Sequence, residues 1–390
     1  MFALFTKSLC LHLTWWLQSL WPNKHDGAPL GLKRLLFLLL GYPLFVGVQL
    51  VHWLGFLVDE LLFRSYQNVE IKAPLFISGI PRSGTTFVHR MLAQNAEQFT
   101  TVSTWEAALA PSITERKLLR ALGALDKALG GVGRKAVNRL IASGAGDFNN
   151  IHEVGLDIPE EDYLWLLPTG SCFILLFAFP FAPRLKQVGM LYNADDTTQQ
   201  RLLDYYERCI QKQLFCSPKG TRFLSKNAAF ASWTGALRKR FPDAQFVLCV
   251  REPQSALSSQ LSSLKSARAL FATDPDGSVT QQVLSEIFAS NYQYLNEQLA
   301  NAERKQIALI DQADLKADSA GVIQKTLSAL SLPLSDTLAE SLNALGGPHH
   351  SAHQHQASAK QSENNEIDVC LRTAYDAILQ SRCRIQSSTH

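Results

Sequence analysis

The sequence has few features of a secreted or a metal-binding protein. It contains seven cysteines, and no two of them form a CxxC pair. That scatter argues against a disulfide framework and against a cysteine-based zinc site. The Asn-x-Ser/Thr acceptor for N-glycosylation is also absent from all 390 residues, which argues against a eukaryotic secretory protein. We therefore expect free thiols, a reducing compartment and a cytoplasmic active site.

Long blocks of like charge are absent as well. The chain has 37 Lys and Arg against 34 Asp and Glu, a formal net charge of +3. A charge so small and so dispersed predicts no nucleic-acid partner, although a small anionic ligand remains compatible with it. With 46% hydrophobic residues the chain can bury a large core, as one large domain with appendages or as two domains.

The N-terminal 21 residues are apolar but have no small-residue cleavage site, so we do not expect a removable signal peptide. As a helix, this stretch has its polar residues roughly along one face, and its tryptophans lie among the apolar residues. The polar residues are Lys7, Ser8, His12, Thr14, Gln18 and Ser19. This pattern is typical of a helix that lies in a membrane interface.

A second apolar stretch, residues 35–58, would reach about 36 Å as a helix, enough to span a bilayer. However, Lys33 and Arg34 before it and Asp59 and Glu60 after it would place all downstream residues outside the cell. We favour association in the plane of a membrane, then packing on the main domain, and last a true span. We expect residues 1–73 to form this N-terminal segment and residues 74–390 the main domain.

From residue 74 onward, short apolar strands alternate with helices. Candidate strands are residues 74–78, 222–226, 244–250 and 306–311, and a clear helix covers residues 196–216. Strands that are apolar throughout belong in a parallel sheet covered on both faces. We therefore predict an α/β fold, a P-loop-like three-layer αβα arrangement with a central parallel sheet, preceded by N-terminal hydrophobic helices.

The loop from Gly79 to Thr86 follows the first strand and precedes a helix. Strand, Gly-bounded loop and helix N-terminus together form an anion site, because unpaired backbone N–H groups converge there. In an ATP-hydrolysing P-loop the residue after the second glycine is a lysine, but here it is Thr85, and the cation is Arg82. An arginine fork beside two threonine hydroxyls suits a phosphate and does not require a metal ion.

This stretch resembles the 5′-phosphosulfate loop of sulfotransferases that use 3′-phosphoadenosine 5′-phosphosulfate (PAPS), which reads P-[KR]-[ST]-G-T-T and then a hydrophobic residue. The matching residues are Pro81, Arg82, Ser83, Gly84, Thr85, Thr86 and Phe87. The resemblance implies that Arg82 and both threonines hold the 5′-phosphate end of PAPS. It also implies that Phe87 lies against the adenine.

The second signature of that family is a strand that ends in arginine, with a serine eight positions later, and it binds the 3′-phosphate. Arg251 and Ser259 match it. The likeness extends over roughly residues 74–345 and is greatest to a large, mostly bacterial branch. Shared features are Trp105-Glu106, the PEED segment at 159–162 and Lys226 on the strand before Arg251.

Sulfuryl transfer needs a base for the acceptor proton and cations for the charge on the leaving phosphate. Arg82 is our candidate cation, assisted by Lys226. The family's histidine base is missing, because that position is Ala228. By likeness to protein-tyrosine sulfotransferases, Glu106 is our candidate base, with a structural role as the alternative. His152 is a reserve base, and Glu161 could also reach the acceptor. We expect Glu160 and Asp162 to cap a helix.

The His-rich stretch within residues 346–365 is polar and turn-rich, and we interpret it as a mobile loop, not as a metal site. The resemblance implies PAPS as co-substrate, no metal, and a small or lipid-like acceptor for which the apolar residues 147–182 form the pocket. Two other hypotheses remain open: a small-molecule P-loop kinase, and a membrane-associated nucleotide-binding protein without catalysis.

Overall fold

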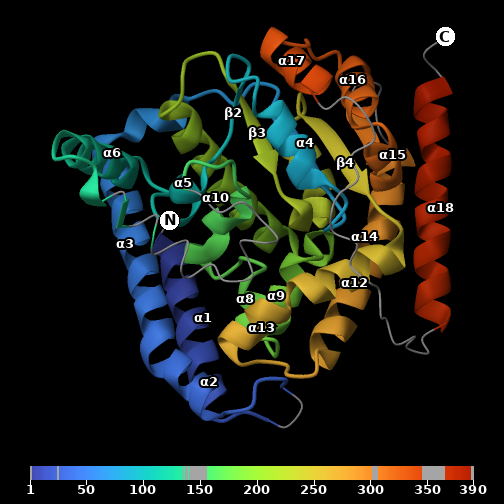
Figure 1. The fold of residues 1–390 in the computed structure, drawn as a ribbon. Coiled ribbons are helices and arrows are strands. Elements are labelled where there is room, and N and C mark those ends of the chain that lie inside the picture. Colours follow the sequence, from blue (N-terminus) through green and yellow to red (C-terminus); the bar gives the residue numbers. More distant parts are fainter. Residues whose placement is uncertain are drawn as a thin grey trace.

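A computed structural model describes residues 2–23, 26–133, 135–136, 139, 156–300, 306–344 and 365–387. Its centre is a parallel sheet with strand order β2-β3-β1-β4-β5 (Figure 1). The strands are β1 (Leu75–Gly79), β2 (Phe99–Thr100), β3 (Arg222–Lys226), β4 (Gln245–Val250) and β5 (Ile307–Asp311). The predicted parallel αβα fold is confirmed, and each of the four strands predicted from apolar runs is present.

Successive side chains of each strand point to opposite faces of the sheet. Leu75 and Ile77 of β1 join one core cluster, while Phe76 between them joins the other. The helices over the first cluster are α4 (Thr85–Leu92), α15 (Gln312–Ala317), α16 (Ser319–Ala329) and α17 (Asp336–Ala344). The helices over the second are α10 (Asp196–Phe215), α11 (Thr234–Arg240), α12 (Pro253–Ser263) and α14 (Ser278–Ala300).

The remaining elements are short, apart from α6 and α18. Between the N-terminal segment and β3 lie η2 (Arg64–Asn68), α5 (Thr104–Ala108), α6 (Ile113–Ala128), η4 (Asp162–Thr169), α8 (Leu175–Ala178), α9 (Pro183–Val188) and η5 (Leu191–Asn193). After β3 come η6 (Ala228–Trp233), α13 (Lys265–Phe271) and α18 (Asn365–Ser387). Helix α18 packs on α14 and α12, at the edge of the molecule opposite α3 (Figure 1).

The N-terminal helices are α1 (Phe2–Leu20), α2 (Leu32–Leu36), the π-helical η1 (Phe37–Gly41) and α3 (Tyr42–Leu62). The last three form one helical rod. The π turn ends two residues before Pro43, which has no amide to donate along the helix. This rod is long and apolar enough to cross a membrane by length and composition. In the structure it lies against the domain, and Trp53 and Phe56 share a core cluster with Phe76 and Phe246 of the sheet.

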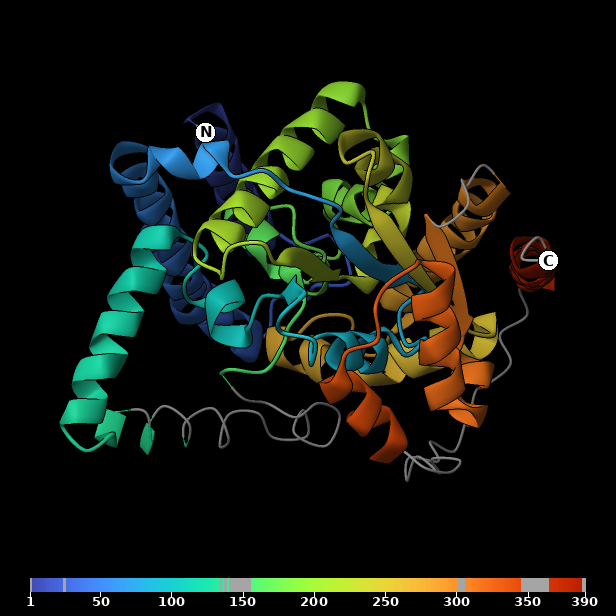
Figure 2. The same cartoon turned by 90° about the horizontal axis from the view of Figure 1, so that it is seen from above.

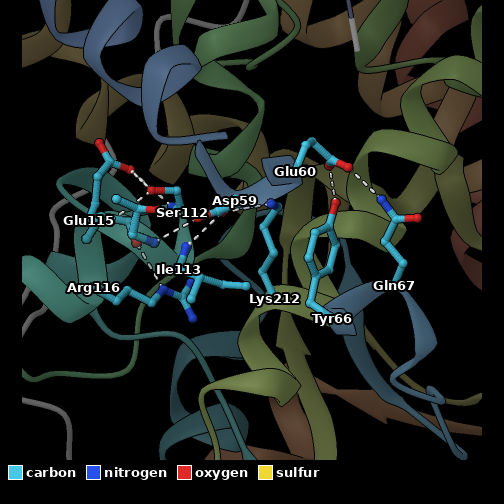
Figure 3. A network of polar contacts seen from close by, with 11 residues as sticks. Asp59, Glu60, Tyr66, Gln67, Ser112, Ile113, Glu115, Arg116 and Lys212 are labelled. Atoms are coloured by element: carbon cyan, nitrogen blue, oxygen red, sulfur yellow. Dashed lines mark hydrogen bonds and ion pairs between the residues drawn. The ribbon is translucent and has the colours of Figure 1, made fainter. Parts of the chain in front are cut away.

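Buried polar contacts fix the end of α3 to the domain (Figure 3). Asp59 and Lys212 form an ion pair of 2.7 Å, and both side chains are almost completely buried. The same carboxylate accepts the backbone amides of Ile113 and Thr114 at 2.9 and 2.8 Å, so it also caps α6. Because a charge buried without its partner is costly, this network determines how α3 sits on α6 and α10.

Three of the polar residues that we expected on the outer side of α1, Ser8, His12 and Ser19, are buried, whereas Thr14 and Gln18 are exposed. Ser8 donates to the carbonyl of Pro168, and His12 Nδ1 lies 2.7 Å from the hydroxyl of Tyr42. Ser19 accepts a hydrogen bond of 3.1 Å from the guanidinium of Arg34. These hydrogen bonds hold Ser8, His12 and Ser19 inside the protein, while Leu9, Leu13 and Leu17 of the same helix are exposed.

Strand β2 ends at Thr100, and a capping box between Ser103 and Glu106 begins α5 soon afterwards. Residues 346–364 of the His-rich stretch that we interpreted as a mobile loop lie outside the described residues.

Candidate functional site

The loop between β1 and α4 is tightly wound because two of its glycines have no room for a side chain. Gly79 has φ of +131°, and a Cβ there would come within 2.0 Å of the carbonyl oxygen of Cys249. Gly84 has φ of +94° and lies directly before α4. Arg82 also has a positive φ, +67°. The result is a loop that leads into the N-terminus of α4, the local geometry of a phosphate site.

The two sequence motifs meet in space. Arg82 Nε donates a hydrogen bond of 3.2 Å to Ser259 Oγ, and Arg251 Nη1 donates one of 3.2 Å to the carbonyl of Arg82. Gln312 of α15 donates to the same carbonyl at 2.8 Å. Strands β1 and β4 are neighbours in the sheet, so the loops that follow them lie at the same edge.

Burial and mutual repulsion act on both arginines. Burial lowers the pKa of Arg82, and the nearby Glu161 carboxylate partly opposes this shift. Burial also lowers the pKa of Arg251, and the charge of Arg82 lowers it further. The two arginines repel each other in a partly desolvated site. A bound anion would therefore stabilise the charged form of both.

Lys226, at the end of β3, forms an ion pair with Glu161, which directly precedes η4. The Lys226 side chain is 5% exposed and that of Glu161 is 22% exposed. The charge of Glu161 also raises the pKa of Arg82, so this carboxylate is near enough to act on both of the cations that we predicted for the leaving phosphate. Of the predicted functional residues, the structure therefore brings Arg82, Lys226, Arg251 and Ser259 into one region.

Asp162 does not cap a helix as we expected. Its Oδ2 accepts a hydrogen bond of 2.6 Å from the hydroxyl of Tyr206, which also lies 3.2 Å from Ser225 Oγ. Burial raises the pKa of Asp162 to about 7. Ser225 directly precedes Lys226 on β3, so these contacts link Asp162 through Tyr206 to the strand that carries the lysine. Glu160 accepts from the amide of Glu161 at 2.9 Å, which is a local turn contact.

Glu106 is held by its own helix. Its Oε2 accepts the amide and the hydroxyl of Ser103 at 3.1 and 2.9 Å, which completes the capping box of α5. Its Oε1 pairs with Arg120 of α6 at 3.1 Å. These contacts account for both carboxylate oxygens and match the structural role that we had kept as the alternative. His152, the reserve base, lies outside the described residues.

His89 of α4 is a site residue that the sequence did not indicate. Its side chain is fully buried, and Nε2 lies 2.7 Å from Thr101 Oγ1. Burial, together with the charges of Lys226 and Arg90, lowers the pKa of His89 to about 3. This imidazole is therefore neutral at physiological pH. The sequence around His89 does not predict that this side chain lies near Lys226, because the two residues are 137 positions apart.

The other loop residues have the exposure that an anion site needs. Pro81, Thr86 and Phe87 are partly exposed, whereas Ser83 and Thr85 are buried, and the hydroxyl of Ser83 donates to the carbonyl of Ile80 at 2.5 Å. Thr85 and Thr86 are the first two residues of α4. Within the described part of the chain, no group of three or more His, Cys, Asp or Glu side chains could hold a metal ion.

Comparison with protein families decides the affiliation. A family model described as "Sulfotransferase family" matches residues 74–140 and 182–336. The chain belongs to the sulfotransferase family. The match covers both the loop that carries Arg82 and the strand end that carries Arg251. A comparison with curated proteins finds no match.

Solved sulfotransferase structures share the fold. The sulfotransferase STF1 from Mycobacterium tuberculosis H37Rv superposes with a TM-score of 0.63 at 17% identity, over 96% of this chain and 92% of that one. The sulfotransferase STF9 from Mycobacterium avium gives a TM-score of 0.59 at 14% identity, over 84% and 81%. At these identities the likeness concerns the fold, and the roles of individual residues in this sulfotransferase rest on its own geometry.

Proposed function

We propose that this sulfotransferase transfers a sulfuryl group from PAPS to a hydroxyl or amine of a small or lipid-like acceptor and releases adenosine 3′,5′-bisphosphate. The observation that carries the proposal is the contact between the two motifs, from Arg82 to Ser259 and from Arg251 to the Arg82 carbonyl. PAPS has phosphate groups at both its 5′ and its 3′ position, so a site for it needs two anion-binding elements side by side.

In this proposal the loop amides, Arg82, Thr85 and Thr86 hold the 5′-phosphate end, and Phe87 lies against the adenine. Pro81, Ser83 and Gly84 shape the loop. Arg251 and Ser259 hold the 3′-phosphate. No metal is needed, because two arginines supply the positive charge that magnesium provides in ATP-hydrolysing enzymes.

The proposed sulfuryl transfer needs a base for the acceptor proton and cations beside the departing phosphate. The acceptor oxygen or nitrogen attacks sulfur in line, the bond from sulfur to the phosphate oxygen breaks, and the acceptor proton passes to a base. Negative charge then builds on the 5′-phosphate of the departing nucleotide, where Arg82 and Lys226 offset it.

We propose Glu161 as the base in place of Glu106. The carboxylate of Glu161 pairs with Lys226, acts on the charge of Arg82, and is partly exposed. The carboxylate of Glu106 is occupied by Ser103 and Arg120. His152 remains the reserve candidate, and it lies outside the described residues.

We propose a small or lipid-like acceptor because the stretch that we expect to form its pocket is rich in apolar residues. Much of the stretch from Tyr163 to Ala182 is core, with Leu175 and Phe179 buried beside Trp15. Phe173, Ile174 and Phe181 are partly exposed and are our candidates for an apolar acceptor wall. We place the enzyme in the cytoplasm, in agreement with the free thiols of the cysteines that the structure describes.

The test is sulfuryl transfer from PAPS labelled with radioactive sulfur to a panel of hydroxyl and amine acceptors that range from small alcohols to long-chain lipids. We expect labelled product without added metal, and its loss in Arg82→Ala. A parallel reaction with ATP labelled in its terminal phosphate and with magnesium addresses the kinase alternative. Phosphoryl transfer from ATP without any sulfuryl transfer from PAPS would overturn the proposal.

A further inference from the structure

Helix α3 has the opposite polarity from a helix that faces water. Its exposed side chains are all apolar, and Leu44, Leu54 and Leu61 are 72%, 59% and 73% exposed. Its polar residues Gln49 and Asp59 are buried against the protein. A surface helix of a soluble domain buries its apolar side and exposes its polar side. The outer side of α3 is therefore built for an apolar environment.

The same polarity continues on the neighbouring helices. Helix α1 buries Ser8, His12 and Ser19 and exposes Leu9, Leu13 and Leu17, and the uncharged Thr6, Thr14 and Gln18 are exposed beside them. Four leucines at helical spacing are exposed among the described residues: Leu118, Leu122 and Leu125 on α6, and Leu129 directly after it. All but three of the large apolar side chains exposed in the described residues lie between Phe2 and Val132, and those three are Leu270, Leu334 and Val369.

These helices form one side of the molecule. In two views related by a rotation about the horizontal axis, α3 and α6 lie at the same edge, on the left (Figures 1 and 2), and α18 lies at the opposite edge. We call the exposed apolar side chains of α1, α3 and α6 the apolar face. Contiguous exposed apolar side chains of this kind mark sites where a protein meets another protein or a membrane.

We infer that the apolar face docks this enzyme onto an anionic lipid bilayer, with α3 lying in the membrane plane. The charges near the face favour such a surface. Lys33 of α2 and Lys117 and Lys127 of α6 are exposed. Helices α1 and α2 contain no acidic residue, and on α3 Asp59 is buried and Glu60 is partly buried. Helices that are apolar on one side with basic residues nearby bind membranes that contain anionic lipids.

The buried side of α3 excludes a transmembrane arrangement of this folded form. A spanning helix would have lipid on all sides, but α3 has the Asp59–Lys212 pair and the 2.6 Å contact between His52 and Glu115 on its inner side. Insertion across a bilayer would break these contacts and leave charged groups in hydrocarbon, which is very costly. Docking in the plane keeps them and covers only the outer side.

The experiment is flotation of the full-length protein with vesicles of phosphatidylcholine, with and without phosphatidylglycerol. We expect the protein to float with vesicles, and more strongly with phosphatidylglycerol. A triple variant on α3, Leu44→Gln with Leu54→Gln and Leu61→Gln, should lower the ratio of bound to free protein by about tenfold or more. A second triple variant on α6, Leu122→Gln with Leu125→Gln and Leu129→Gln, should also weaken binding.

The matched control replaces the three exposed apolar residues outside the face, as Leu270→Gln with Leu334→Gln and Val369→Gln, and should float like the unaltered chain. All nine positions are exposed, and circular dichroism with thermal unfolding checks that each variant is folded. Absence of flotation, or equal flotation of all variants, would overturn the inference. So would a dimer in sedimentation velocity that becomes a monomer in the α3 variant, because a second copy would then cover the face.

Discussion

The guanidinium of Arg82 donates a hydrogen bond of 3.2 Å to the hydroxyl of Ser259, although the two residues are 177 positions apart. The contact joins the loop after β1 to the helix after β4. Each motif alone would be a site for a single phosphate at the end of a strand. Together they place two cationic anion-binding elements side by side, which is the basis of our proposal of a nucleotide phosphorylated at two positions.

Replacing the serine tests that pairing. We expect Ser259→Ala to weaken the binding of adenosine 3′,5′-bisphosphate by about tenfold, the value of one hydrogen bond to a charged group. Adenosine 5′-phosphate, which lacks the 3′-phosphate, should bind both proteins equally. The neighbouring Ser258→Ala, on the same partly exposed helix, is the control. Equal loss for both nucleotides would contradict the assignment of Ser259 to the 3′-phosphate.

The assignment of the base is tested by two matched substitutions. With an acceptor from the transfer assay, Glu161→Gln should lower kcat by about 100-fold or more and keep nucleotide binding, because glutamine cannot take the acceptor proton. Glu106→Gln should keep kcat close to the unaltered value, because glutamine still completes the capping box of α5. The reverse pattern, loss in Glu106→Gln alone, would restore Glu106 as the base.

The buried Asp162 predicts a pH dependence of stability. Its pKa rises from 3.8 to about 7 on folding because it is buried. The folded state therefore holds the proton more tightly, so this contribution to stability is complete below pH 3.8 and is lost as pH rises through about 7. Asp162→Asn should remove the dependence and keep an acceptor for Tyr206. Relative to the unaltered chain, the variant should gain free energy of unfolding between pH 5 and 8.

Urea unfolding of both proteins at several pH values in that range measures the difference. The slope is at most about 1.4 kcal/mol per pH unit for one proton. A difference between the two proteins that does not change with pH would mean that Asp162 is ionised in the folded state throughout.

The Asp59–Lys212 pair predicts strong coupling between α3 and the domain. Asp59→Asn and Lys212→Met should each lower the free energy of unfolding by about 3 kcal/mol, because each leaves one buried charge without its partner. The double variant should lose less than the sum of the two, since it buries no unpaired charge. Strict additivity in urea unfolding would show that the two side chains do not depend on each other.

The sequence predicted the sheet and the loops well because these signals are local. The apolar run from residue 244 to 250 could only be a buried strand, and the Gly79 to Thr86 loop carries its own motif. Even the meeting of Arg82 with Arg251 was foreseeable, since the loops at the carboxyl ends of parallel strands share one edge of the sheet.

Contacts between distant residues were not predictable in the same way. Glu106 and Glu161 are both acidic residues after a strand or loop, and only the fold shows that one caps a helix while the other pairs with Lys226. The polarity of α1 was visible in the sequence, but its orientation was not. The same pattern fits a polar side turned to water or one turned to Pro168 and Tyr42.

The most direct test of the central claim is isothermal titration of the purified protein with adenosine 3′,5′-bisphosphate and with ATP and magnesium. We predict tight binding of the bisphosphate, a loss of about tenfold or more in both Arg82→Ala and Arg251→Ala, and no loss in Arg240→Ala. Arg240 is the control because it pairs with Asp204 and Glu207 on the surface of α10. Preference for ATP with magnesium, or binding that is indifferent to Arg251→Ala, would contradict the account.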